Sequence, residues 1–186
     1  MADPNTLKLS SRHEDATKDI LSAYMVNPEI SVFDKLKIQA QVLVPLLLAF
    51  LAELGEERAN QIIRSTLREW SNQLFHDIGA RLEGSPKQKW AALSAAITHK
   101  TYEYVDLDVL RQDKEAIEVN ITRCRLAEFF KQLGEPELGA LLACEVDFDM
   151  VTVGNPEVEL SRTQTIMKGA SHCDFRYRLK KAADPK

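Results

Sequence analysis

Apolar residues recur every three or four positions over the first half of the chain, which is the spacing of one face of an α-helix. This pattern runs from about Glu14 to His99. Breaks fall at Gly55 and at the Gly-Ser-Pro sequence of residues 84–86, where glycine and proline end helices. We therefore predict a helical half made of several helices over residues 14–99.

Two features of this half affect the predicted core. The longest apolar run, "VLVPLLLAFLA" at residues 42–52, is too short to span a bilayer and contains Pro45. We predict a buried helix that the proline bends or divides, with a membrane-contacting surface as the alternative. An apolar outward face would instead make it a dimer surface or a lid over a ligand pocket. On the next helix, Trp70 and Phe75 are expected in the core and His76 at the surface.

After His99 the apolar period changes to two, which is typical of half-buried strands. The segment "EAIEVNIT" places Ile117 and Val119 on one face and Glu118 and Asn120 on the other. The predicted strands are 101–110, 115–122, 156–164 and 173–179, with a turn at 111–114 and helices at 125–134 and 135–148. The fold class that follows is α+β, a helical N-terminal half packed on a small antiparallel sheet with two further helices. We predict a single domain over residues 1–186, in which residues 100–180 form the half that contains the sheet.

Composition and charge narrow the class of protein. The 186 residues carry a net charge of -4 with acidic and basic residues interspersed, which argues against nucleic acid as a partner. The N-terminal stretch lacks the apolar segment of a secretory signal, and the chain has only three cysteines. We therefore predict a cytoplasmic protein with reduced thiols that does not bind a membrane.

The three cysteines all lie in the last third of the chain, each at the edge of a predicted element. Cys124 follows a strand, Cys144 is near the end of a helix, and Cys173 begins the last strand. Taken singly, a cysteine is more often core filler than a reactive group. Several polar residues lie near them in the sequence, namely Asp147, Asp149, Arg162, His172 and Asp174.

The segments "ITRCRLAEFFKQLGEPELGALLACEVDFD" and "ELSRTQTIMKGASHCDFRYRL" resemble the L-2-amino-thiazoline-4-carboxylic acid hydrolase family. The pattern of that family includes a cysteine that opens a helix, a glycine-proline helix entry, a C-x-x-D at the end of that helix, and a terminal R-x-x-T…G…C-D-F. The matching residues here are Cys124, Gly134, Pro136, Cys144, Asp147, Arg162, Thr165, Gly169, Cys173, Asp174 and Phe175. The likeness is good over residues 115–180. A more distant likeness is to the four-vinyl-reductase-like small-molecule-binding domain, whose zinc-ligand position falls on Thr165 here.

The resemblance implies a hydrolase that opens a small nitrogen-containing ring, such as a cyclic amidine of the aminothiazoline-carboxylate type. Cys124 or Cys173 is the candidate nucleophile, because a thiolate is the strongest side-chain nucleophile near neutral pH. Asp147 is the candidate general base, if burial raises its pKa. Arg162 is expected to hold the carboxylate of a small-molecule substrate, since its planar fork makes two hydrogen bonds.

Four further residues are candidate substrate contacts: Cys144, Glu118, Asn120 and His172. The sequence requires no cofactor, although zinc is an open alternative through Cys124, Cys144 and Cys173, with Asp147 or His172 as a fourth ligand. Their spacings are long and include no C-x-x-C pair. A non-catalytic small-molecule-binding module with a cysteine-based zinc site is the alternative function, and a homo-oligomer remains open as a state of assembly.

Overall fold

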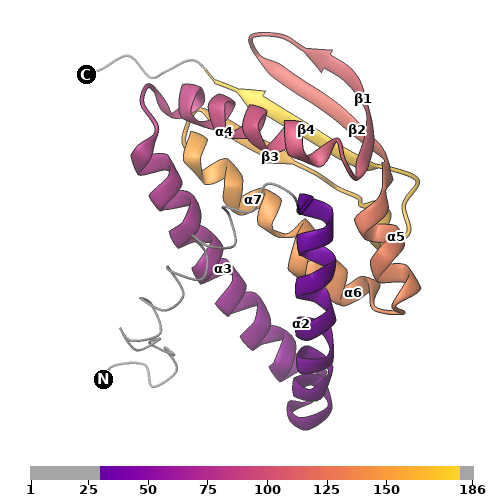
Figure 1. Ribbon diagram of the computed structural model, residues 1–186. Helices are drawn as coiled ribbons and strands as arrows, with labels where there is room; N and C mark the ends of the chain where they lie inside the picture. The colour runs from indigo at the N-terminus through magenta and orange to yellow at the C-terminus, as the bar shows by residue number, and fades with distance from the viewer. Residues whose placement is uncertain (1–29, 181–186) are drawn as a thin grey trace, which may run out of the picture.

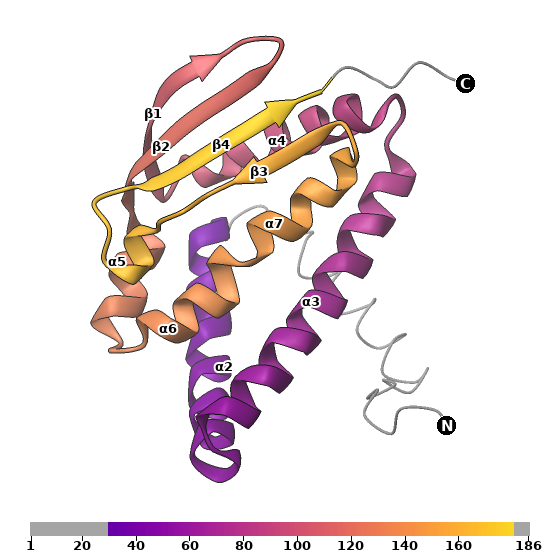
Figure 2. The ribbon, with the colours of Figure 1, turned by 180° about the vertical axis from the view of Figure 1, so that it is seen from behind.

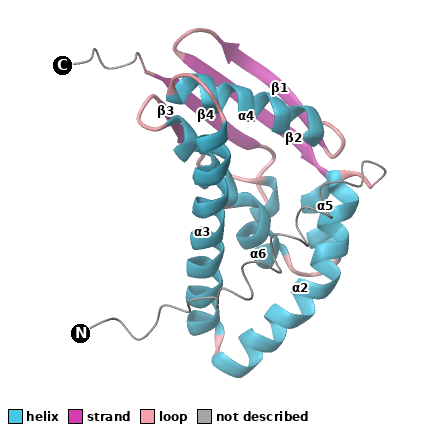
Figure 3. Ribbon diagram, turned by 60° about the vertical axis from the view of Figure 1, so that its left-hand side comes forward, coloured by secondary structure: helices cyan, strands magenta, loops and turns pink. Residues whose placement is uncertain are grey.

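The computed structural model describes residues 30–180, and the helix predicted to begin near Glu14 lies mainly outside this range. The architecture is α+β, as predicted: long helices form the first part and a four-stranded antiparallel sheet lies in the second (Figures 1 and 3). With the labels of Figure 1, the first part comprises α2 (Val32–Leu54), α3 (Glu56–Arg81) and α4 (Pro86–Thr101).

Local signals in the sequence explain where these helices begin and end. The Ser31 hydroxyl accepts a hydrogen bond from the Asp34 backbone N–H and caps the start of α2. Gly55, at φ 78°, ends α2 and directly precedes α3. Ser85 and Gln88 form a reciprocal capping box at the start of α4, next to Pro86. The helices α2 and α3 diverge from their shared end as a V (Figure 3).

The prediction of a buried apolar helix at residues 42–52 is wrong. The helix α2 passes through Pro45 without being divided, and only 17% of its most apolar 18-residue window is buried. Within residues 30–180, α2 is long and apolar enough to cross a membrane by length and composition, with a window hydropathy of 1.5. Its outward side carries a row of apolar side chains at four-residue spacing: Ile38, Val42, Leu46, Phe50 and Leu54. Ala40, Val44 and Leu47 lie on the buried face of α2, and the apolar row lies on a different face of the helix, which is exposed.

The sheet has the strand order β1-β2-β4-β3, and every neighbouring pair is antiparallel. Its strands are β1 (Val105–Gln112), β2 (Ala116–Cys124), β3 (Val158–Ser161) and β4 (Cys173–Leu179). All four predicted strands are present, but residues 101–104 end α4 and form a turn instead of extending β1. One face packs on helices, through Ile117 and Tyr177 against Trp90 of α4. Figure 2 views the sheet from the face that the helices leave open.

The segment predicted as one helix at residues 135–148 is a chain of short helical turns. It comprises α6 (Pro136–Gly139), a π-helical turn η1 (Ala140–Cys144), α7 (Val146–Met150) and a 3₁₀ turn η2 (Val151–Gly154). The helix α5 (Arg125–Gln132) precedes it, and a 3₁₀ turn η3 (Ile166–Lys168) lies between β3 and β4. π-Helical turns concentrate at functional sites because they shift the register of the side chains that follow.

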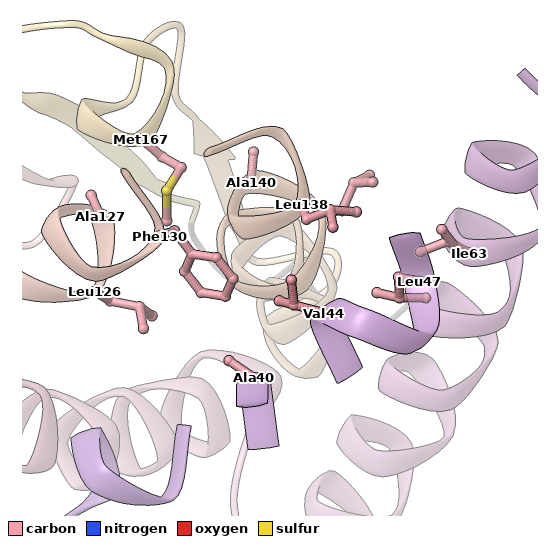
Figure 4. Close-up of a cluster of buried hydrophobic side chains, with 11 residues drawn as sticks. Ala40, Val44, Leu47, Ile63, Leu126, Ala127, Phe130, Leu138, Ala140 and Met167 are labelled. Atoms are coloured by element: carbon pink, nitrogen blue, oxygen red, sulfur yellow. The ribbon is translucent and has the colours of Figure 1, made fainter. Parts of the chain in front are cut away.

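The main core lies where α2, α3, α5 and α6 meet. Val44 of α2 points toward Phe130 of α5 and Leu138 of α6, and Met167 of η3 closes the cluster above Phe130 (Figure 4). Gly139 lies against Phe130, where a Cβ would come within 2.6 Å of the ring. This packing fixes η1 and α7 relative to η3, and these are the elements that carry the candidate site.

Candidate functional site

The Arg162 side chain is held by two hydrogen bonds and two aromatic rings. It follows β3, and strand alternation turns it to the face that the helices cover. Its guanidinium donates to Asp147 Oδ2 at 2.5 Å and to the Cys144 carbonyl at 2.8 Å. Its Cζ atom lies 4.9 Å from the Phe148 ring centroid and 5.1 Å from that of Phe175. With only 6% of its side chain exposed, Arg162 is buried and held between two aromatic rings.

Asp147 lies on α7 opposite this guanidinium, and its side chain is 31% exposed. Burial raises the pKa of Asp147 to about 6, and the attraction of Arg162 opposes that rise without cancelling it. The carboxylate is therefore mostly ionised at pH 7 and still titrates close to neutrality. Burial raises the pKa of Tyr104 and of Tyr177 as well, and the negative charge of Asp147 raises both further.

The three thiols lie near enough to Asp147 that its charge acts on the pKa of each of them. Burial raises the pKa of Cys124, Cys144 and Cys173, in the case of Cys144 to about 12, and the charge of Asp147 raises each pKa further. Charge on Cys124 likewise raises the pKa of Cys144 and of Cys173. The structure thus brings together the three cysteines, Asp147 and Arg162, and it keeps the thiols protonated at neutral pH.

Cys173, Asp174 and Phe175 all hold the segment that carries Arg162. Cys173 Sγ accepts a hydrogen bond from the Ile166 backbone N–H at 3.2 Å. The carboxylate of Asp174 accepts from the backbone N–H groups of Thr163 and Gln164 at 2.9 and 2.8 Å, and from the Thr163 hydroxyl at 2.6 Å. Burial would raise the pKa of Asp174, but these hydrogen bonds outweigh it and lower the pKa.

Thr165 and Gly169 shape the rest of the same loop. The Thr165 hydroxyl accepts from the Lys168 backbone N–H at 3.2 Å and caps η3. Gly169 ends η3 at φ 95°, a left-handed conformation that favours glycine. The motif R-x-x-T…G…C-D-F therefore forms one interlocked loop, with Arg162 at its start.

Two predicted substrate contacts do not reach this site. Glu118 and Asn120 of β2 point to the outer face of the sheet, away from Arg162. There Arg176 donates to Asn120 Oδ1 at 2.8 Å and lies 4.0 Å from Glu118. Side chains along β2 alternate between the two faces of the sheet, so Glu118 and Asn120 lie on the face opposite to that of Ile117 and Val119. His172 lies beside the Gln164 amide, at 3.1 to 3.3 Å, and is separate from the inward-facing Cys173.

A groove beside Arg162 has a volume of about 620 Å³. Its lining includes Cys144, Arg162 and Trp70. Trp70 was predicted to lie in the core, but it is 48% exposed. Phe75 is buried, and His76 is exposed, as expected. One signal for the groove was present in the sequence: Arg64, Arg68 and Ser71 recur at helical spacing beside the apolar stripe of α3.

The zinc alternative finds no support in the arrangement of side chains. Among residues 30–180, no group of three or more His, Cys, Asp or Glu side chains is placed to hold a metal ion. Cys124 and Cys173 accept backbone N–H groups, from Ala127 at 3.4 Å and from Ile166 at 3.2 Å.

The sequence profile of the L-2-amino-thiazoline-4-carboxylic acid hydrolase family matches residues 35–177. The chain belongs to this family. The match includes every residue of the loop motif and extends through α2 to α4, which confirms the resemblance and extends it beyond residues 115–180. The family is named for a hydrolase, which supports enzyme activity of that general kind.

Other comparisons add little to this assignment. No curated protein matches the chain. One similar solved structure is that of a trafficking protein particle complex subunit 3 from Naegleria fowleri covalently bound to palmitic acid, with 14% identity, coverage of 78% of this chain and 97% of that chain, and a TM-score of 0.43. Another is the phenol-responsive sensory domain of the transcription activator PoxR with phenol, with 14% identity, coverage of 74% and 72%, and a TM-score of 0.41. At such TM-scores neither structure supports an inference about this protein.

Proposed function

We propose that this protein is a hydrolase that opens a small nitrogen-containing ring at a carbon–nitrogen bond, with a substrate of the aminothiazoline-carboxylate type. The observation that carries the proposal is the Asp147–Arg162 ion pair, with Arg162 nearly fully buried and Asp147 partly exposed near the three thiols, in a member of a hydrolase family. A carboxylate whose pKa is about 6 has the acidity expected of a general base that works near neutral pH.

In the proposed reaction, Asp147 takes a proton from a water molecule as the water oxygen attacks the ring carbon of the C=N group. The C–N bond of the tetrahedral intermediate then breaks. The ring nitrogen, which carries one proton in the amidinium form of the substrate, leaves as an amine with the proton that Asp147 returns, and the hydroxyl proton of the intermediate passes to water as the carbonyl forms. One water is consumed, and an aminothiazoline carboxylate becomes an S-carbamoyl-cysteine. Because the pKa of Asp147 is about 6, its ionised form exceeds the protonated form by about tenfold at pH 7.

Arg162 has two roles in this proposal. It fixes the orientation of Asp147, and its donors that have no partner are available to the substrate carboxylate. A guanidinium has five N–H groups. Two hydrogen bonds, to Asp147 and to the Cys144 carbonyl, are all that Arg162 makes within residues 30–180. A substrate carboxylate bound at the remaining donors would lie beside the proposed base.

A cysteine-assisted route is the second version of the same chemistry. Of the three thiols, Cys124 is the best candidate, because it caps the N-terminus of α5 and accepts the Ala127 N–H. In this route Asp147 takes the Cys124 proton and the sulfur attacks the ring carbon. The ring C–N bond then breaks as the nitrogen takes that proton, and water later attacks the same carbon and breaks its bond to Cys124, which leaves as the thiol. The raised pKa of Cys124 disfavours a resting thiolate, so direct attack by water is the first choice.

The proposal is tested by incubating the purified protein with L-2-amino-thiazoline-4-carboxylate and following the product by mass spectrometry. A product one water heavier shows ring opening. After the protein is filtered off, thiol titration separates the two possible bonds, because C–S cleavage releases a free thiol and C–N cleavage does not. We expect C–N cleavage, and therefore no released thiol. We expect Asp147→Asn to lower the rate of ring opening by at least about 100-fold, which is the lower end of the contribution of a general base.

The matched control is Asp77→Asn, which changes an exposed carboxylate on α3 and should leave turnover unchanged. Intact-mass analysis of Cys124→Ser and of the parent protein separates the routes, since only the thiol route gives an adduct that the variant lacks. Full turnover in Asp147→Asn would refute the proposed base. Binding of the ring without turnover would favour the alternative of a non-catalytic small-molecule-binding protein. The three free thiols lead us to propose a reducing, cytoplasmic compartment.

A further inference from the structure

The groove beside Arg162 is a feature that the proposed chemistry alone does not require. Its floor is formed by η1 and α7, one wall by α3, and the other wall by the loop over residues 162–170. In Figure 2, α7 runs between α3 and β3 on this side of the molecule. Both α7 and Arg162 thus contribute to the lining of the groove.

The charges that line the groove are not balanced. Arg64 on α3 forms an ion pair with Glu145, and Asp149 accepts the hydroxyl of the buried Ser71. Arg68 on α3 and Lys168 on η3 also line the groove, and neither forms an ion pair within residues 30–180. Two cations from different walls and the Asp149 carboxylate are thus left to face the same space, and the positive charges of the lining outnumber the negative ones, which favours an anionic ligand.

Two large aromatic side chains line the same groove and remain accessible. Trp70 of α3 is 48% exposed and Phe148 of α7 is 42% exposed. Phe148 also stacks on the guanidinium of Arg162, which fixes its ring. Exposed aromatic rings in a concave site provide flat contact area for a planar ligand at low cost in side-chain entropy.

The size of the groove sets the size of its ligand. A volume of about 620 Å³ lies within the range of pockets that hold drug-sized molecules, roughly 300–1,000 Å³. An aminothiazoline carboxylate has only nine non-hydrogen atoms and would leave most of this space to water. The groove therefore suits a larger molecule of which the reacting ring is one part.

We infer that the groove binds an anionic ligand with a planar aromatic body, whose negative charge lies between Arg68 and Lys168 and whose ring packs on Trp70 and Phe148. As a statement about the substrate, this inference rests on the proposed function: the natural substrate is then a cyclic amidine or amide that carries an aromatic substituent and an anionic group. As a statement about a binding site, it stands on the groove alone.

The experiment uses 1-naphthoate as the probe and the fluorescence of tryptophan as the readout. The chain has two tryptophans, of which Trp90 is buried in the core and Trp70 lines the groove. We expect 1-naphthoate to quench the parent protein with saturation, and the neutral 1-naphthamide to bind several-fold more weakly. In Trp70→Phe the quenching should disappear, while calorimetry should still detect binding.

The charge contacts are tested by Arg68→Gln and Lys168→Gln. Each substitution should weaken the binding of 1-naphthoate by about threefold to tenfold and the binding of the neutral amide by less than about twofold. Arg58→Gln is the matched control, since Arg58 is exposed on α3, bonds Gln61 and does not line the groove. Equal weakening by Arg58→Gln would show general charge attraction and overturn the inference. So would the absence of saturable quenching, or equal affinity for the acid and the amide.

Failure of this inference and failure of the proposed function can be told apart. Asp147→Asn should bind 1-naphthoate as the parent does while losing ring opening, because Asp147 does not line the groove. Ring opening without saturable naphthoate binding would overturn the groove assignment alone. Naphthoate binding that depends on Arg68 and Lys168, in a protein that opens no ring, would overturn the enzyme proposal alone.

Discussion

Replacing Asp147 by asparagine should stabilise the protein at pH 8 while removing its activity. The substitution keeps the size of the side chain and one oxygen that can accept from Arg162, but it removes the negative charge. Burial makes that charge unfavourable, as the rise of the pKa from 3.8 to about 6 shows. Between about pH 4 and 6 the folded protein therefore binds more protons at this site than the unfolded chain does. The free energy of unfolding contributed by Asp147 falls as the pH rises through this window.

The size of the effect follows from the two pKa values. The difference between 3.8 and about 6 corresponds to about 3 kcal/mol in the free energy of unfolding. The protein loses this stability as the pH rises from about 4 to above 6. Because 31% of the side chain is exposed and water reaches it, this figure is an upper limit. For a chain of this length, 1 kcal/mol moves the melting temperature by about 2–4 °C, so Asp147→Asn should melt about 5–10 °C higher at pH 8. At pH 4 the two proteins should be equally stable.

Urea unfolding of the parent and the variant at half-unit steps from pH 4 to 8 measures this difference directly. Asp77→Asn serves as the control, because its carboxylate is half exposed and its difference from the parent should stay within about 0.5 kcal/mol throughout. A variant less stable than the parent at pH 8 would refute the reasoning, since it would mean that pairing with Arg162 outweighs the cost of burial. A difference that does not change with pH would refute it equally.

Three further substitutions test other parts of the structure. Arg162→Lys keeps the charge but loses the planar fork, and it should lower kcat/KM for ring opening by about 10- to 100-fold, measured by product formation. Gly139→Ala should cost about 1–3 kcal/mol in urea unfolding, because the new Cβ would lie 2.6 Å from Phe130 and 2.7 Å from Met167. Glu118→Gln should leave turnover unchanged within about twofold, since surface changes seldom act at a distance, and a larger loss would show that the outer face of the sheet takes part.

Most of the fold could be predicted from periodicity, because the two halves of the chain have different periods and different local signals. The strand β2 was predicted over 115–122 and is found at Ala116–Cys124, with Ile117 and Val119 on the covered face. The predictions failed where tertiary context decides the outcome. An apolar run such as that of α2 predicts burial, but only packing decides how much of a helix perimeter is covered. The spacing of apolar residues does not distinguish the π-helical turn at Ala140–Cys144 from an α-helix.

The candidate site likewise has parts that the sequence could predict and parts that depend on tertiary packing. Sequence reasoning named Asp147 and Arg162 together, and the structure pairs them directly. Glu118 and Asn120 were also predicted as substrate contacts, and the structure places them on the outer face of the sheet with Arg176, away from Arg162. The helical spacing of Arg64, Arg68 and Ser71 indicated a polar face on α3, but the position of the groove could not be predicted, because it forms between α3 and a loop about 100 residues later in the chain.

The position of Cys173 at the start of the last strand has a structural explanation that does not need a nucleophile. Its sulfur accepts the Ile166 N–H, the next residue binds the backbone at Thr163 and Gln164, and Phe175 stacks on Arg162. Three consecutive residues thus fix both ends of the segment that begins with Arg162. Cys173→Ser would keep a hydrogen-bond acceptor at this place, so loss of activity in that variant would show a need for sulfur chemistry, whereas retained activity would show that the motif works by positioning Arg162 against Asp147.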